Sequence, residues 1–74
     1  MTSQHMVHLA NQIALFFASY PKDEAVEGVA DHIQMFWEKR MKQQIVKYVD
    51  EGGAGLHELA LEAVKRLTPA IGQP

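Results

Sequence analysis

Apolar residues recur at helical spacing along most of this chain, and they divide it into four segments that we expect to be α-helices. The first segment begins at Thr2 or Ser3, either of which can cap a helix N-terminus. It runs to about Ser19 and is ended by Tyr20-Pro21. The second segment begins near Asp23, whose carboxylate suits the first turn of a helix.

The third segment stops at Gly52-Gly53, which is the expected punctuation at a helix C-terminus. The last segment begins near His57 or Glu58, and we expect Thr68-Pro69 to end it. About residues 69–74 would then form a frayed tail. No stretch shows the alternation of apolar and polar residues that a strand needs. We therefore predict an all-α fold, a small bundle of three to four helices, in a single domain over residues 1–74.

Each predicted helix has an apolar face for the core of this domain. In the first helix we expect the core face to consist of Val7, Ala10, Ala14 and Phe17. The stripe on the second, the clearest helical period in the chain, is Val26, Val29, Ala30, Ile33 and Phe36 or Trp37. The third helix carries Met41, Ile45, Tyr48 and Val49, and the last stacks Leu59, Ala60, Ala63 and Leu67.

The small size of the domain limits its stability, because a small core buries little apolar surface. A chain of 74 residues buries only about 60% of its unfolded surface on folding. The sequence has no Cys, which excludes disulfides, thiolate metal sites and iron–sulfur ligation. Its apolar fraction of 47% is too high for a disordered chain. Binding to a partner protein remains as the source of additional stability.

The overall charge argues against several classes of partner. A formal net charge of -2 provides no general attraction to nucleic acid or to an anionic membrane. The N-terminus shows no secretion signal, and no apolar run approaches the roughly 20 residues of a membrane span. We therefore expect a cytoplasmic protein that contacts neither nucleic acid nor a membrane.

The distribution of charge is more informative than its sum. No Asp, Glu, Lys or Arg occurs between Met1 and Pro21, and all 16 charged residues lie between Lys22 and Arg66. A surface helix normally turns charged side chains toward water, whereas interface centres are depleted in charge. We interpret the uncharged polar side of the first helix as a docking face. The alternatives are a central place in its own bundle, or chance.

Several residues are of types that occur in catalytic, metal-binding or phosphate-binding sites, but a structural role explains each of them more simply. Asp31 and His32 are adjacent on a helix and do not face one another, so they are a poor acid–base pair. His5 and His8 share a helix face, but the sequence places no third metal ligand beside them. The Gly52–Gly55 run lacks the Lys-Ser/Thr of a phosphate loop. We therefore assign no catalytic, cofactor-binding or metal-binding residue.

A basic cluster in the third segment raises the possibility of a helix-turn-helix nucleic-acid binder. The cluster consists of Lys39, Arg40, Lys42 and Lys47. Acidic residues on the same segment offset it, and no glycine marks the required turn near Trp37-Glu38. A solvated face, or a positive rim that meets an acidic partner surface, explains the cluster as well.

Three short signatures resemble a known family. They are Val7-His8-Leu9-Ala10-Asn11-Gln12-Ile13-Ala14, then Val29-Ala30-Asp31-His32-Ile33 with Phe36-Trp37-Glu38-Lys39-Arg40-Met41, and Gly52-Gly53-Ala54-Gly55-Leu56. In order and approximate spacing they resemble the delta subunit of cytosolic, molybdenum-containing, NAD-dependent formate dehydrogenases. Lys39 stands where that family usually has a proline, so the second and third helices either separate or join with a kink.

The resemblance implies a non-catalytic accessory subunit of a multi-subunit oxidoreductase. The catalytic subunit of such an enzyme would carry bis-molybdopterin guanine dinucleotide and iron–sulfur clusters, oxidise formate, and pass electrons to an FMN subunit that reduces NAD. The delta subunit would hold no cofactor, and would aid assembly, stability or molybdenum-cofactor loading of the catalytic subunit. The alternative is a free-standing helical adaptor or regulator, either alone or as a homodimer through the uncharged first helix.

The expected partner-binding residues combine these arguments. Asn11 and Gln12 can both donate and accept hydrogen bonds, which suits pairing with backbone groups of a partner. Trp37, the single tryptophan, is either an interface anchor or a core residue. The full predicted set is His8, Asn11, Gln12, Leu15, Trp37 and Arg40.

Overall fold

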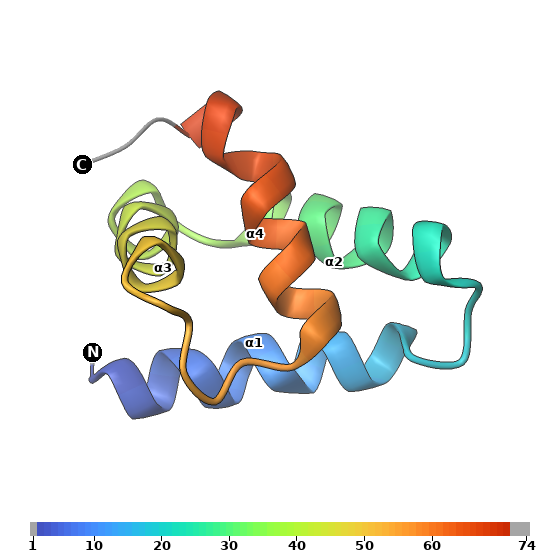
Figure 1. Ribbon diagram of the computed structural model, residues 1–74. Coiled ribbons are helices and arrows are strands. Elements are labelled where there is room, and N and C mark those ends of the chain that lie inside the picture. Colours follow the sequence, from blue (N-terminus) through green and yellow to red (C-terminus); the bar gives the residue numbers. More distant parts are fainter. Residues whose placement is uncertain (1, 72–74) are drawn as a thin grey trace.

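A computed structural model describes residues 2–71, which form four helices. They are α1 (Ser3–Phe17), α2 (Lys22–Phe36), α3 (Lys39–Asp50) and α4 (Glu58–Ile71), and the described residues contain no strand. The helices α1 and α2 run side by side, α4 crosses both, and α3 closes one end of the domain (Figure 1). The all-α prediction is confirmed.

The helix α1 begins with a side-chain cap and packs through small residues. The hydroxyl of Thr2 accepts a hydrogen bond of 3.1 Å from the backbone N–H of His5, so Thr2 rather than Ser3 is the cap. The buried residues are Met6, Ala10 and Ala14, which recur every four residues and let the neighbouring helices approach closely. The predicted core face is therefore shifted slightly: Val7 is only partly buried, and Met6 takes its place.

The boundary between α2 and α3 is a break and not a kink. Trp37 and Glu38 both have extended backbones, with φ and ψ of −87° and 139° and of −70° and 160°. The extended conformation at Trp37 follows the last residue of α2 and lets its side chain enter the core, where it is 9% exposed. Phe36, which is still helical, is left 69% exposed. Of the two candidates for the end of the core stripe, the structure selects Trp37.

The glycine pair after α3 forms the predicted helix stop. The N–H of Gly53 donates to the carbonyl of Tyr48, and the N–H of Gly52 donates to that of Val49, which is the hydrogen-bond pattern of a Schellman motif. Both glycines have positive φ, at 120° and 63°, so the turn depends on their lack of a side chain. The hydroxyl of Tyr48 also donates to the carbonyl of Ala54 at 2.6 Å, which holds the connection to α4 against α3.

The helix α4 packs against the other three helices and extends further than the sequence predicts. It begins at Glu58, and the ring Nδ1 of His57 accepts the N–H of Leu59 as a cap. Pro69 lies inside the helix, which continues to Ile71, so the predictions of an end at Thr68-Pro69 and of a frayed tail from residue 69 are wrong. Pro69 has no N–H to donate to the carbonyl of Lys65, so α4 continues past it with one backbone hydrogen bond fewer. The rest of the predicted tail, residues 72–74, lies outside the described residues.

The core joins α4 to the other three helices. Its largest fully buried side chains are Val26, Val29, Ile33, Ile45, Val46 and Val64. Val46 and Val64 were not among the expected core residues, whereas Met41, Tyr48 and Val49 pack at the margin of the core. All four helices face this core with their buried sides, and one side of α1 and the adjoining side of α2 remain at the surface.

Candidate partner-binding surface

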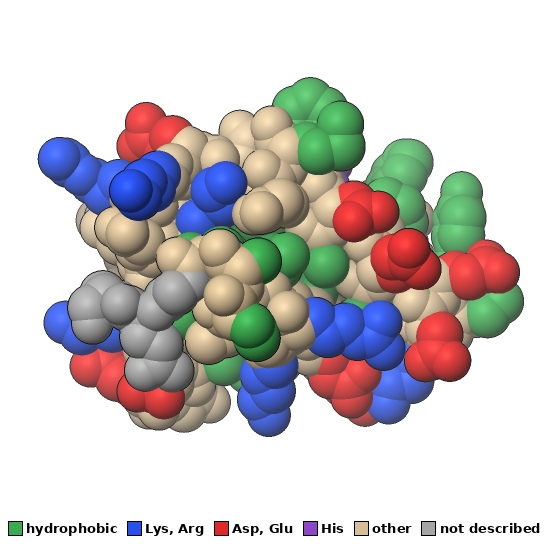
Figure 2. All heavy atoms as spheres, turned by 90° about the horizontal axis from the view of Figure 1, so that it is seen from above, with side chains coloured by type: hydrophobic (Ala, Val, Ile, Leu, Met, Phe, Trp, Pro, Cys, Tyr) green, Lys and Arg blue, Asp and Glu red, His purple; other side chains and the backbone are tan. Residues whose placement is uncertain are grey.

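The exposed large hydrophobic side chains gather on α1 and α2. Leu15, Phe16 and Tyr20 lie in the last turn of α1 or just after it, and Met35 and Phe36 end α2. Phe16, Met35 and Phe36 are the most exposed of these, at 72%, 74% and 69%. Hydrophobic side chains project along one edge of the molecule in Figure 2. Among the described residues, α3 and α4 contribute no exposed side chain of this kind.

A groove connects the exposed parts of α1 and α2. It is lined by Gln12, Ile13, Phe16, Phe17 and His32, and its volume is about 430 Å³. Four of the five lining residues come from α1, and His32 closes the groove from α2. We refer to this groove together with Phe16, Met35 and Phe36 as the α1–α2 apolar surface.

Aromatic contacts hold the shape of the α1–α2 apolar surface. The rings of Phe16 and Phe17 meet edge to face with their centroids 5.1 Å apart, and the ring of Phe17 meets that of Tyr20 at 5.7 Å. On α2, the ring centroids of His32 and Phe36 are 4.8 Å apart. These contacts restrict the side chains before any partner arrives, which lowers the entropy cost of binding.

Gly28 explains how Phe17 can lie so close to α2. A Cβ atom at Gly28 would come within 2.6 Å of the Phe17 ring, which is far inside van der Waals contact. The group that approaches α2 at Gly28 is therefore an aromatic side chain and not a backbone segment.

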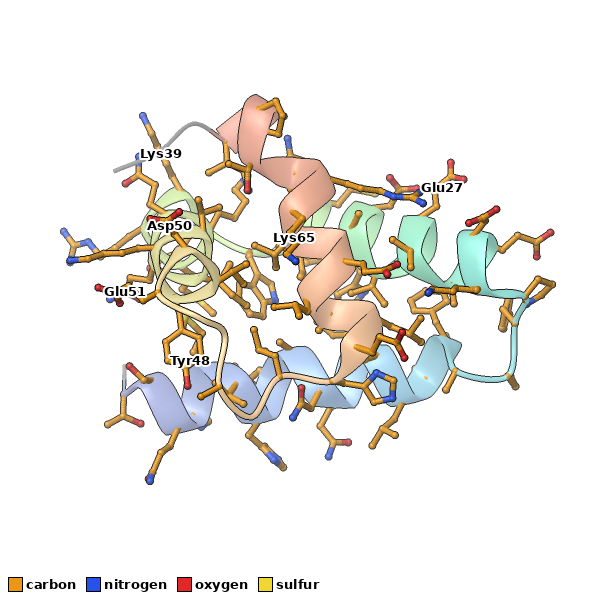
Figure 3. The ribbon with its side chains drawn as sticks, in the orientation of Figure 1. Glu27, Lys39, Tyr48, Asp50, Glu51 and Lys65 are labelled. Carbon is orange, nitrogen blue, oxygen red and sulfur yellow. The ribbon has the colours of Figure 1, made fainter. Side chains whose placement is uncertain are left out.

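The charges around the α1–α2 apolar surface are acidic on one side only. Glu24, Glu27 and Asp31 are exposed, and with Met35 they follow the spacing of three and four residues that aligns side chains along one helix face. We refer to these three carboxylates as the acidic row. Acidic side chains lie beside the projecting hydrophobic ones in Figure 2, and Glu27 points away from the domain in Figure 3. The other border, on α1, carries no Asp, Glu, Lys or Arg.

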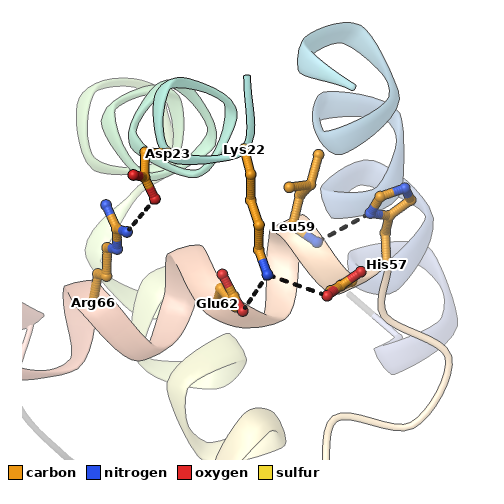
Figure 4. Close-up of polar contacts among 7 residues, drawn as sticks. Lys22, Asp23, His57, Leu59, Glu62 and Arg66 are labelled. Atoms are coloured by element: carbon orange, nitrogen blue, oxygen red, sulfur yellow. Dashed lines mark hydrogen bonds and ion pairs between the residues drawn. The ribbon is translucent and has the colours of Figure 1, made fainter. Parts of the chain in front are cut away.

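The cation at the start of α2 is directed toward α4 and away from the acidic row. The Lys22 ammonium lies 3.2 Å from a carboxylate oxygen of Glu62 and 3.4 Å from one of Glu58 (Figure 4). A third ion pair, of 3.7 Å, joins the guanidinium of Arg66 on α4 to the carboxylate of Asp23 on α2. Hydrogen bonding and charge from Glu62, and then from Glu58, raise the pKa of Lys22. These exposed ion pairs join α4 to α2. Because the Lys22 ammonium contacts Glu58 and Glu62, it does not pair with the carboxylates of the acidic row.

The predicted partner-binding residues are not all at the surface. His8, Gln12 and Leu15 are exposed on α1, and Arg40 is exposed in the first turn of α3, so their role remains a prediction. Trp37 is part of the core, which corrects its assignment as an interface anchor: its extended backbone directs the indole inward.

Asn11 has a structural role besides the one expected. Its amide Nδ2 donates to the carbonyl of Gly55 at 2.9 Å, and its Oδ1 accepts the N–H of His57 at 2.8 Å. Both polar atoms therefore bind the connection between α3 and α4. Each of these atoms keeps a further hydrogen or lone pair, so pairing of the Asn11 amide with a partner backbone stays a prediction.

Sequence reasoning missed Phe16, Met35 and Phe36 as surface residues. Phe36 was a candidate for the core, and neither Phe16 nor Met35 was assigned to a face. A usable signal was present in α2, where Met35 lies off the stripe formed by Val26, Val29 and Ile33 and yet is apolar.

The candidate chemical residues form no reactive cluster in the described part of the chain. Asp31 is exposed, while the half-buried ring of His32 contacts Phe36. No group of three or more His, Cys, Asp or Glu residues comes together there in a way that could hold a metal ion. In the same part of the chain, no helix has the length and apolarity required to cross a membrane.

Comparison with known proteins relates the chain to a described family. The model of the family described as NADH-dependent formate dehydrogenase delta subunit FdsD matches residues 5–64. The match covers α1, α2, α3 and the first half of α4, and so includes the whole α1–α2 apolar surface. Comparisons with curated proteins and with solved structures gave no significant match.

Proposed function

Because the chain belongs to the delta-subunit family of NADH-dependent formate dehydrogenases, we propose that it is a non-catalytic accessory subunit of such an enzyme. Its role would be to bind the catalytic subunit and to aid the assembly, the stability or the molybdenum-cofactor loading of that subunit. We further propose that it acts in the cytoplasm.

The observation that carries this proposal is the exposed α1–α2 apolar surface. Phe16, Met35 and Phe36 are each about 70% exposed on a chain of only 74 residues. Contiguous apolar patches on small proteins mark interaction sites, because their burial against a partner is favourable. A surface of this kind supports binding to another subunit.

In this proposal, the redox chemistry of the complex takes place in other subunits. The bis-molybdopterin guanine dinucleotide, the iron–sulfur clusters and the FMN would be held by the catalytic and flavin subunits, and NAD would bind to the latter. The donor set of this chain fits that division, because it has no Cys, the usual ligand of iron–sulfur clusters. The contribution of this chain would be to reduce the exposed apolar surface of a partially assembled catalytic subunit.

The test is to produce the complex with and without this subunit in the same host. We expect its omission to lower the yield of soluble catalytic subunit, its molybdenum content per protomer, or its thermal stability, with a proportional loss of formate-dependent NAD reduction. The isolated chain should show no formate oxidation and no stoichiometric cofactor. A complex of normal yield, metal content, stability and activity in its complete absence would contradict the proposal and favour a free-standing adaptor.

A further inference from the structure

We propose that the α1–α2 apolar surface is the docking site for the catalytic subunit. We further propose that it receives an apolar segment of that subunit flanked by Lys or Arg residues, which face the acidic row. This inference rests on the proposed function and adds to it the location of the contact and the chemistry of the partner.

The apolar part of the argument comes from exposure and shape. Large aromatic side chains such as Phe16 and Phe36 bury about 150–250 Å² each when they are fully enclosed. The groove beside them, at about 430 Å³, is much larger than the roughly 150 Å³ cavity that accommodates benzene in an engineered protein. It therefore has room for at least one large apolar side chain of a partner. Insertion of such an anchor would bury Phe16 and Ile13 as well as the anchor itself.

The charges around the surface specify which partner fits. Glu24, Glu27 and Asp31 lie along the α2 border, and the α1 border has no charged side chain. A partner that covers the apolar centre must bring its own surface next to these carboxylates. Basic residues at that position would gain from the acidic row, whereas acidic residues would be repelled.

The same charges argue against a second copy of this chain as the occupant. Lys22 is the single cation of α2, and its ammonium contacts Glu58 and Glu62 of α4. Since α1 has no Lys or Arg, the cation that borders this surface on a second copy is Lys42 of α3, whose ammonium already donates to the carbonyl and the side chain of Gln34. A symmetric pair would therefore bury the apolar centre without bringing a cation of α1 or α2 to the carboxylates. A different protein with Lys or Arg residues at this position would bury the apolar centre and also pair with the carboxylates of the acidic row.

The experiment measures the affinity of the full chain for the purified catalytic subunit. We expect Phe16→Ser and Phe36→Ser each to weaken binding at least tenfold, because buried aromatic residues commonly dominate the energy of an interface. The matched control is Gln44→Ser, an exposed position on α3, which should leave binding unchanged. Circular dichroism of each isolated variant should show unaltered helicity, because both phenylalanines are exposed in the domain.

A second set of variants tests the acidic row. Asp31→Lys and Glu27→Lys should slow association and weaken binding, and the loss should become smaller as salt screens the charges. The isosteric Asp31→Asn and Glu27→Gln should show intermediate effects. Binding strengthened by the lysine variants would overturn the assignment of a basic partner segment.

The outcomes separate this inference from the proposed function. If the wild-type chain binds the catalytic subunit and both serine variants bind equally well, the docking site lies elsewhere, although the proposed function stands. If Phe36→Ser instead abolishes a dimer of the isolated chain without affecting that binding, a second copy is the occupant. If the wild-type chain does not bind the catalytic subunit at all, both the inference and the proposed function fail.

Discussion

Asn11 shows how much a single side chain can contribute in so small a domain. Its amide connects α1 to Gly55 and His57 through hydrogen bonds, and these residues lie 44 and 46 positions later in the chain. Both bonds fall at the connection between α3 and α4, and one of them holds His57, the residue that caps α4. Asn11 therefore helps to orient α4, which packs against all of the other three helices.

We expect Asn11→Ala to lower the free energy of unfolding by about 1–3 kcal/mol, because it removes two hydrogen bonds worth about 1 kcal/mol each and leaves the His57 N–H without its acceptor. Asn11→Asp should also destabilise, since it loses the donor to the Gly55 carbonyl and places a carboxylate beside it. Urea unfolding followed by circular dichroism measures both changes. Gln12→Ala, at the exposed neighbouring position, serves as the control and should change stability by less than about 0.5 kcal/mol. Equal stability of all four proteins would show that the Asn11 contacts contribute nothing.

At the scale of elements, the packing of α1 against α2 creates the candidate site. Gly28 leaves space on α2 for the Phe17 ring, and this ring lines the groove beside His32. The same ring contacts Phe16 and Tyr20 edge to face. The fit between the two helices therefore controls both the stability of the domain and the shape of the groove.

Gly28→Ala tests this packing. An alanine would favour the helix by about 1 kcal/mol, but its Cβ would lie 2.6 Å from the Phe17 ring, and overpacking costs about 1–3 kcal/mol. We expect a net destabilisation of about 1 kcal/mol in thermal or urea unfolding. The same substitution in a Phe17→Leu background should be less harmful, because the smaller side chain can move away. A stabilising effect in the wild-type background would mean that Phe17 moves aside at no cost.

At the scale of the whole molecule, charge and apolar surface are segregated. The ion pairs of Lys22 and Arg66 join α2 to α4, whereas the α1–α2 apolar surface has an acidic border and a neutral one. A domain of 74 residues has only a few kcal/mol of stability from its core. Burial of the apolar surface in a complex would therefore raise the stability of the whole domain.

This leads to a prediction about the assembled subunit. A partner at 100 times its dissociation constant should stabilise the fold by about 2.7 kcal/mol, because it binds the folded chain and not the unfolded one. Amide hydrogen exchange should therefore slow across the entire domain when the purified catalytic subunit is added, since the most protected amides exchange by global unfolding. Phe36→Ser, which we expect to bind poorly, should show little added protection. Slower exchange confined to α3, or none with the wild-type chain, would contradict the prediction.

The sequence by itself determined the helical elements and their punctuation. Periodic apolar residues, the cap at Thr2 and the glycine pair at Gly52-Gly53 are local signals, because each acts through neighbours within one or two helical turns. The family signatures and the absence of charge before Lys22 are also properties of the chain alone. These signals were sufficient to predict an all-α domain and to direct attention to the first helix.

Only the tertiary structure decided which residues reach the surface. Phe36 and Trp37 are equivalent candidates by periodicity, and the backbone break at Trp37 selects between them. The contacts of Asn11 and the groove between Phe16 and His32 depend on segments that are distant in sequence. Helix crossing is set by the packing of side chains from several elements at once, and periodicity within one helix contains no information about it.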